Sequence, residues 1–155
     1  MAVNRLKEFL DTNNIKYINV FHSHAYTAQE VAASAHIPGR KLAKTVMVKI
    51  DGKMAMAVLS ASDKIDFVLI QETAGASKVE LASEYEFTDL FPGCQIGAIP
   101  PFGNLYEMQV IVDTKLTEEN EIVFNAGSYT ELISLQYEDF KRLVKPTVVK
   151  FSYNS

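Results

Sequence analysis

The 155-residue chain lacks the features that mark several specialised classes of protein. It has a single cysteine, Cys94, so no internal disulfide framework can form and a reducing compartment is expected. No apolar run approaches the length that spans a bilayer, and the first residues lack the apolar core of a secretion signal. The sequence therefore predicts a cytoplasmic protein with no membrane partner.

An excess of positive charge is also missing. Lysine and arginine number 15 against 19 acidic residues, which gives a net charge of −4. This balance argues against a general nucleic-acid coat, because such proteins are normally basic. A small local patch is still compatible with it, since Arg40, Lys41 and Lys44 fall within five residues. A cluster of this kind is more often a solvated face than a binding site.

What remains is the composition of an ordinary globular protein, with 48% hydrophobic and 22% charged residues. The length predicts one domain, residues 1–155, with a substantial core. Helical spacing and capping signals, including Ser62 as a cap, predict helices over residues 3–12, 27–35, 63–73, 83–90 and 137–144. Apolar, β-favouring runs predict strands over residues 17–21, 42–50, 54–59, 79–81, 109–113, 121–125, 130–135 and 148–153.

Two of these strands are joined by Asp51-Gly52, which is a strong hairpin signal. The strand over residues 54–59 is apolar on both faces, so we expect it at the centre of the sheet. Because hairpins alternate with helices, the sequence predicts an α+β fold on a mixed, mostly antiparallel sheet.

The most distinctive segment is residues 90–106, where Gly97, Pro100, Pro101 and Gly103 punctuate an apolar stretch. Proline fixes the backbone and removes a donor, whereas glycine lets the backbone approach a ligand closely. Such a loop can present a few aimed amides to a small polar ligand. The alternative is a stiff surface connection without a ligand. The amides left near the double proline belong to Gly97, Ala98, Ile99, Phe102 and Gly103.

Lys44 lies near the start of a predicted strand, on the same face as Val46, Val48 and Ile50. If that face points to the core, the ammonium lies at the rim of the interior and needs a partner. A ligand phosphate, hydroxyl or carbonyl would serve, and a neighbouring carboxylate is the ordinary alternative. Thr45, Met47 and Lys49 are equally available as the inward set.

The sequence offers no clear covalent nucleophile. Asn125-Ala126-Gly127-Ser128 ends a strand, for which a turn is the ordinary explanation, and no histidine follows Ser128 to act as its base. Cys94 has no cation nearby in the sequence to lower its pKa, so a packed thiol is expected.

The three histidines do not make a metal site by themselves. His22 and His24 would share a strand face, but two ligands without a third cysteine or carboxylate are a weak signal. His36 follows a predicted helix and is expected to bond carbonyls there. We therefore predict no metal and no cofactor. The aromatic residues are spread at core-like intervals, so no base-stacking platform is indicated.

Taken in order, these pieces resemble the YbaK and prolyl-tRNA synthetase-associated editing domains. The resemblance is carried by residues 21–32, Gly39, residues 42–46, residues 90–106 and residues 124–128, which together span nearly the whole chain. No single piece is specific, but the combination is. The family fold is a curved, barrel-like mixed sheet surrounded by helices, in agreement with the fold class predicted above.

The resemblance implies hydrolysis of the ester of wrongly charged tRNA. Lys44 matches the family lysine that engages the terminal adenosine or its phosphate, and Gly97 and Pro101 match the Gly-x-x-x-Pro motif that grips the aminoacyl end. An aminoacyl ester is already reactive, so positioning and a carbonyl donor suffice, without a covalent intermediate. The expected substrate-binding residues are Thr45, Gly97, Ala98, Ile99, Pro101, Phe102, Gly103, Asn125, Gly127 and Ser128.

Two hypotheses follow. The first is a deacylase acting on misacylated tRNA, most simply tRNA for proline carrying a small wrong amino acid, with a synthetase as a candidate presenting partner. The second is a non-catalytic aminoacyl- or nucleotide-binding module, suggested by Tyr129 where relatives are expected to carry histidine, because a phenol is a poor base near neutral pH. A thiol hydrolase using Cys94 is the weakest alternative.

Overall fold

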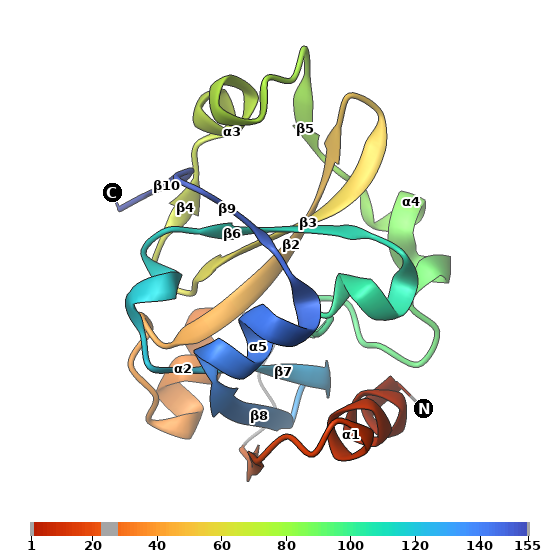
Figure 1. The fold of residues 1–155 in the computed structure, drawn as a ribbon, viewed down its shortest axis with the longest axis vertical. Helices are drawn as coiled ribbons and strands as arrows, with labels where there is room; N and C mark the ends of the chain where they lie inside the picture. Colours follow the sequence, from red (N-terminus) through yellow and green to blue (C-terminus); the bar gives the residue numbers. More distant parts are fainter. Residues whose placement is uncertain (1, 23–27, 155) are drawn as a thin grey trace.

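The hairpin predicted around Asp51-Gly52 forms the centre of the computed structural model, which describes residues 2–22 and 28–154 (Figure 1). Strands β2 (Leu42–Ile50) and β3 (Lys53–Ser60) pair antiparallel along their whole length. Asp51 and Gly52 both have positive φ, 50° and 84°, as a tight hairpin turn requires. Most of β3 is buried, which confirms its predicted place inside the sheet.

The remaining strands extend this hairpin into a curled sheet. Its order is β1-β8-β7-β2-β3-β6-β9, and β5 pairs with the far end of β2. The bounds are β1 (Tyr17–Phe21), β5 (Val79–Leu81), β6 (Gln109–Asp113), β7 (Glu121–Ser128), β8 (Glu131–Gln136) and β9 (Thr147–Val149). A separate pair joins β4 (Lys64–Ile65) to β10 (Ser152–Tyr153). Three pairings are parallel, β2 with β7, β3 with β6 and β6 with β9, and the others are antiparallel. The predicted α+β fold with a mostly antiparallel mixed sheet is confirmed.

Helices cover both faces of the sheet. They are α1 (Ala2–Thr12), α2 (Ala28–Ala35), α3 (Phe67–Ala74), α4 (Glu84–Phe87) and α5 (Tyr137–Val144), with single 3₁₀ turns η1 (Thr88–Leu90), η2 (Gly103–Tyr106) and η3 (Leu116–Glu118). Helices α1 and α5 pack beside β7 and β8 on the largest core, whereas α3 lies near β5 at the other end (Figure 1). In the described part of the chain, no helix is long and apolar enough to cross a bilayer.

The helix predicted over residues 63–73 with Ser62 as its cap is wrong in its first turn. Residues 64 and 65 instead form β4, and the helix begins at Phe67. The side chain of Asp66 caps it by accepting the amides of Val68 and Leu69 at 3.0 and 3.1 Å. The long-range pairing with β10 therefore decides where this helix starts.

The strand predicted over residues 148–153 is divided between two sheets. Strand β9 ends at Val149, and β10 begins at Ser152. Between them the buried carboxylate of Asp113 accepts the amides of Phe151 and Ser152, both at 2.9 Å. This buried acceptor turns the chain away from β9, which the local pattern of apolar residues does not reveal.

The other elements follow the prediction closely, several of them to the residue, as in β1, β2, β6 and α5. Strand β7 continues past the predicted end at Asn125 through a bulge to Ser128. The predicted cap at Thr27 lies outside the described residues. His36 has a positive φ of 56° directly after α2, in the left-handed conformation typical of a helix end.

Candidate active site

Lys44 points to the face of β2 that also carries Val46, Val48 and Ile50, the last three of which pack into a secondary core. Its ammonium donates to the main-chain carbonyl of Asp63 at 2.6 Å and faces that of Ala61 at 3.4 Å. Burial lowers the pKa of Lys44, while the negative charge of Asp63 opposes that shift and the positive charge of Lys64 adds to it. Lys44 is thus a half-buried cation held mainly by carbonyl groups.

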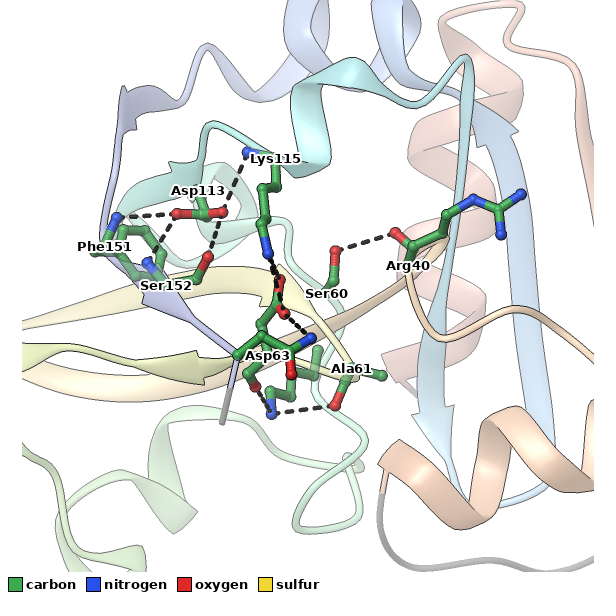
Figure 2. A network of polar contacts seen from close by, with 10 residues as sticks. Arg40, Ser60, Ala61, Asp63, Asp113, Lys115, Phe151 and Ser152 are labelled. Atoms are coloured by element: carbon green, nitrogen blue, oxygen red, sulfur yellow. Dashed lines mark hydrogen bonds and ion pairs between the residues drawn. The ribbon is translucent and has the colours of Figure 1, made fainter.

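The turn that supplies these carbonyls is fixed by a polar network (Figure 2). The carboxylate of Asp63 is 4% exposed and contacts the ammonium of Lys115 at 3.4 Å. Asn154 donates to the same carboxylate at 3.3 Å, and the hydroxyl of Ser60 donates to the carbonyl of Arg40 at 3.0 Å. Because the turn is anchored from several elements, the position of the Lys44 ammonium is defined.

Asn125 and Lys44 follow directly after a paired position of the sheet. Strands β2 and β7 run parallel, and their pairing ends with Ala43 opposite Phe124, so the register brings Lys44 and Asn125 next to each other at the end of the paired stretch. The amide nitrogen of Asn125 donates to the carbonyl of Gly97 at 3.4 Å. Its buried Oδ1 has no hydrogen-bond partner among the described residues. An unsatisfied buried acceptor carries a free-energy cost in the unliganded protein.

The glycine–proline loop is tied to the bulge of β7. The amide of Gln95 donates to the carbonyl of Gly127 at 2.9 Å, and the amide of Tyr129 donates to Oε1 of Gln95 at 2.6 Å. Gly97 has a φ of 85°, which favours glycine at this point. The two predicted motifs, far apart in the sequence, therefore form one structural unit.

The inner part of the loop serves to hold it in place. The amides of Ala98 and Phe102 are used within the loop, donating to the carbonyls of Gln95 and Pro100. The ring of Phe102 is fully buried and packs against the rings of Phe9, Phe124 and Phe140. A Cβ on Gly103 would collide with the carbonyl of Met108, so the close approach there requires glycine. Pro101 is also buried.

The outer part of the loop faces a largely apolar cavity of about 230 Å³. Its walls include Thr45, Met47, Phe87, Ile96, Gly97 and Ile99. The structure thus brings together three predicted substrate-binding residues, Thr45, Gly97 and Ile99. Lys44 is not among the described residues that line the cavity. It lies beside it, one residue from Thr45 and across from Asn125, which contacts the loop at Gly97.

The edge of β2 is open where it meets this cavity. The carbonyl of Lys41 accepts from Val123 of β7, and the carbonyl of Met47 accepts from Ala82 after β5, both at 3.0 Å. Main-chain groups of a strand alternate in direction, so the amide and carbonyl of Thr45 point to the same side of β2 as the carbonyls of Lys41 and Met47. The pairing of β2 with β7 ends at Ala43, and its pairing with β5 begins at Val48. Thr45 therefore presents a main-chain donor and acceptor between the two neighbouring strands.

Residues 22–143 match the family model described as the aminoacyl-tRNA editing domain. The chain belongs to this family. It is 32% identical over 114 residues to the multifunctional Ser/Thr-tRNA deacylase ProXp-y of Escherichia coli (strain K12), covering 70% of this chain and 68% of that protein. It is 31% identical over 85 residues to the proline–tRNA ligase of Bacillus mycoides (strain KBAB4), covering 55% of this chain and 15% of the ligase.

Solved structures show the same editing-domain fold at lower sequence identity. One is described as a candidate trans-editing enzyme for prolyl-tRNA synthetase, with a TM-score of 0.82, 18% identity and coverage of 99% of this chain and 98% of that one. The hypothetical protein APE2540 has a TM-score of 0.84, 19% identity and coverage of 96% and 99%. Both matches extend over nearly the whole chain.

Other candidate groups in this editing domain have local roles. The hydroxyl of Ser128 lies 3.4 Å from that of Thr130 and accepts the amide of Thr130 at 3.3 Å, as in an ordinary turn. Burial raises the pKa of the Cys94 thiol, so the thiol form dominates at neutral pH, which disfavours a nucleophilic role. Burial also raises the pKa of its neighbour Tyr106 to about 12.

No group of three metal-ligating side chains occurs within residues 2–22 and 28–154. His24, half of the predicted histidine pair, lies outside those residues. Sequence reasoning missed Met47, Phe87 and Glu84 as cavity residues. Each has an ordinary explanation in the sequence, as a core or a helix-surface position. Only the docking of the segment after β5 onto β2 brings them together.

Proposed function

We propose that this editing domain hydrolyses the ester of misacylated tRNA, holding the terminal adenosine beside Lys44 and the aminoacyl group in the adjoining cavity. The observation that carries the proposal is the position of Gly97. This residue lines the cavity and also accepts a hydrogen bond from Asn125, the neighbour of Lys44. One loop residue therefore connects a cationic position with an apolar cavity of about 230 Å³.

The proposed chemistry is positioning without a covalent intermediate. The oxygen of a water forms a bond to the acyl carbon, the bond to the ribose oxygen breaks, and the proton passes to that oxygen. Main-chain amides at the cavity wall, such as that of Thr45, are suited to stabilise the carbonyl oxygen as negative charge develops on it. Holding an already reactive ester against water supplies much of the acceleration. The raised pKa of Cys94 and the local bonds of Ser128 agree with this scheme.

The proposed substrate is a tRNA, most simply that for proline, charged with a small wrong amino acid. The similarity to a Ser/Thr-tRNA deacylase and to part of proline–tRNA ligases supports this class. The cavity selects by size, and each methylene changes discrimination by about 1–3 kcal/mol. Presentation of the tRNA by a synthetase and a cytoplasmic location complete the proposal.

A panel of tRNAs charged with alanine, serine, threonine or proline tests the proposal. We expect hydrolysis well above the buffer rate for at least one small amino acid, and a fall of about tenfold to hundredfold in Lys44→Ala. Lys41→Ala is the matched control, because Lys41 is a nearby lysine whose ammonium contacts Glu121 at 3.9 Å. Activity should survive that change. No hydrolysis of any charged tRNA would reject the proposed activity.

A non-catalytic binding module is the second candidate, and the position of Tyr129 favours it. The amide of Tyr129 donates to the side chain of Gln95, so Tyr129 lies next to the start of the loop. This is the position where relatives are expected to carry a histidine that could accept a proton. A phenol serves poorly in that role near neutral pH. Calorimetry that detects tight binding of an aminoacyl-adenosine analogue, together with no hydrolysis in the panel, would favour this function.

A further inference from the structure

Among the described residues that line the cavity, the one with a charged side chain is Glu84. It is the first residue of α4, and Phe87 of the same helix is buried in the cavity wall. The side chain of Glu84 is exposed at the rim, whereas Met47, Ile99 and Phe87 make the interior apolar. The cavity thus combines an apolar interior with a carboxylate at its opening.

The other charges close to this rim are compensated. The ammonium of Lys49 contacts the carboxylates of Glu86 at 2.6 Å and Glu80 at 3.3 Å, and that of Lys78 contacts Glu80 at 3.4 Å. These two cations balance these two acids. In the described part of the chain no ion pair or hydrogen bond engages the carboxylate of Glu84. The rim therefore carries one uncompensated negative charge, and Lys49 is already occupied and does not compete for it.

We infer that Glu84 binds the α-ammonium group of the aminoacyl ester, while the apolar interior takes the amino-acid side chain. This inference rests on the proposed deacylase function and names a further specificity residue for it. Every aminoacyl ester carries an ammonium on the carbon between its carbonyl and its side chain. With the side chain directed inward past Gly97 and Ile99, the ammonium remains near the opening, where a carboxylate can accept its hydrogen bonds.

The inference predicts a restriction on the substrate class. Esters with a free α-ammonium should be accepted, and esters whose amine is acylated should be rejected, because acylation removes the charge and adds bulk at the rim. Peptidyl-tRNA and formylated initiator tRNA fall in the rejected class. A deacylase built in this way would spare the blocked esters that a ribosome requires.

The test compares two non-hydrolysable probes that differ at one atom. Both are adenosines with an amide in place of the 3′ ester, one carrying an alanyl and the other a lactyl group, so that a hydroxyl replaces the ammonium. By calorimetry the unaltered protein should bind the alanyl probe about fivefold more tightly, the size expected for an ion pair open to solvent. Glu84→Gln should reduce this ratio to near one, and Glu84→Lys should invert it.

Glu72→Gln is the matched control, since Glu72 is an exposed glutamate on α3 outside the cavity lining. It should keep the preference of the unaltered protein, and thermal unfolding should show that all three variants fold. A ratio unchanged by Glu84→Gln would overturn the inference while leaving the deacylase function intact, provided that the tRNA panel shows hydrolysis. If the panel shows none and neither probe binds, the proposed function itself fails and the role of Glu84 fails with it.

Discussion

The two faces of β2 beside the cavity present different kinds of chemistry. On one face Lys44 is held by the carbonyls of Ala61 and Asp63, within a network of polar contacts that extends to Lys115. On the other face Met47 is buried in the main core and lines an apolar cavity. A strand reverses the direction of its side chains at every residue, so two neighbouring positions can reach both environments. Lys44 is therefore suited to hold a ligand, and the cavity beside Met47 is suited to select it by size.

Removal of the Phe102 ring should have the largest effect, and it acts on stability. Phe102→Ala deletes a fully buried ring that packs against three others under the loop, so the free energy of unfolding should fall by about 3–5 kcal/mol. Denaturant unfolding measures this change. A loss below about 1 kcal/mol would mean that the loop does not depend on this anchor.

The sequence predicted most helices and strands well, because the signals that define them lie within each segment. Asp51-Gly52 and the apolar runs on either side of it define β2 and β3 without help from the rest of the chain. The start of α3 was missed because Ser62 and Asp66 are both acceptable caps, and the pairing of β4 with β10 decides between them. Such decisions depend on residues about ninety positions away.

Part of the candidate site could be proposed from the sequence. The resemblance pointed to Lys44, Gly97 and Asn125, and the structure brings them near one another through the register of β2 with β7 and one hydrogen bond. It did not identify Glu84 or Phe87, because the cavity exists only where the amide of Ala82 bonds to the carbonyl of Met47. Ala98 and Phe102 were expected to offer free amides, but the turns of the loop use them internally.

Loss of the Lys44 ammonium should have the next largest effect, and it acts on activity. Lys44→Ala removes the charge-assisted contact that we propose between Lys44 and the ligand, worth about 1.5–3 kcal/mol, so kcat/KM for the best tRNA should fall about tenfold to hundredfold. The unfolding free energy should change little, since carbonyls that lose this donor can bond to water. Lys44→Arg should restore part of the activity. Unchanged kcat/KM in Lys44→Ala would remove Lys44 from the site.

Enlargement of the cavity should change selectivity more than rate. Met47→Ala removes a buried side chain from the wall, so aminoacyl groups larger by one or two methylenes should gain about tenfold in kcat/KM relative to alanine. Val48→Ala is the control, because Val48 is equally buried but packs on the opposite face of β2. It should lower stability and leave the ratio of substrates unchanged. Equal selectivity shifts in both variants would contradict the division of roles between the faces.

Neutralisation of Asp63 should have the smallest effect at neutral pH and a clear one in alkali. Burial holds the pKa of Lys44 below its usual value, the charge of Asp63 raises it again, and that of Lys64 lowers it further. In its proposed role Lys44 acts as the ammonium, which persists below its pKa and is lost as the pH rises through it. Asp63→Asn removes the charge that supports the ammonium, so the alkaline limb of the profile of kcat/KM against pH should move to lower pH. Lys115→Met, which leaves Asp63 charged and removes its cationic partner, should move that limb the opposite way. An alkaline limb at the same pH in both variants would show that Asp63 only holds the turn in place and does not change the pKa of Lys44.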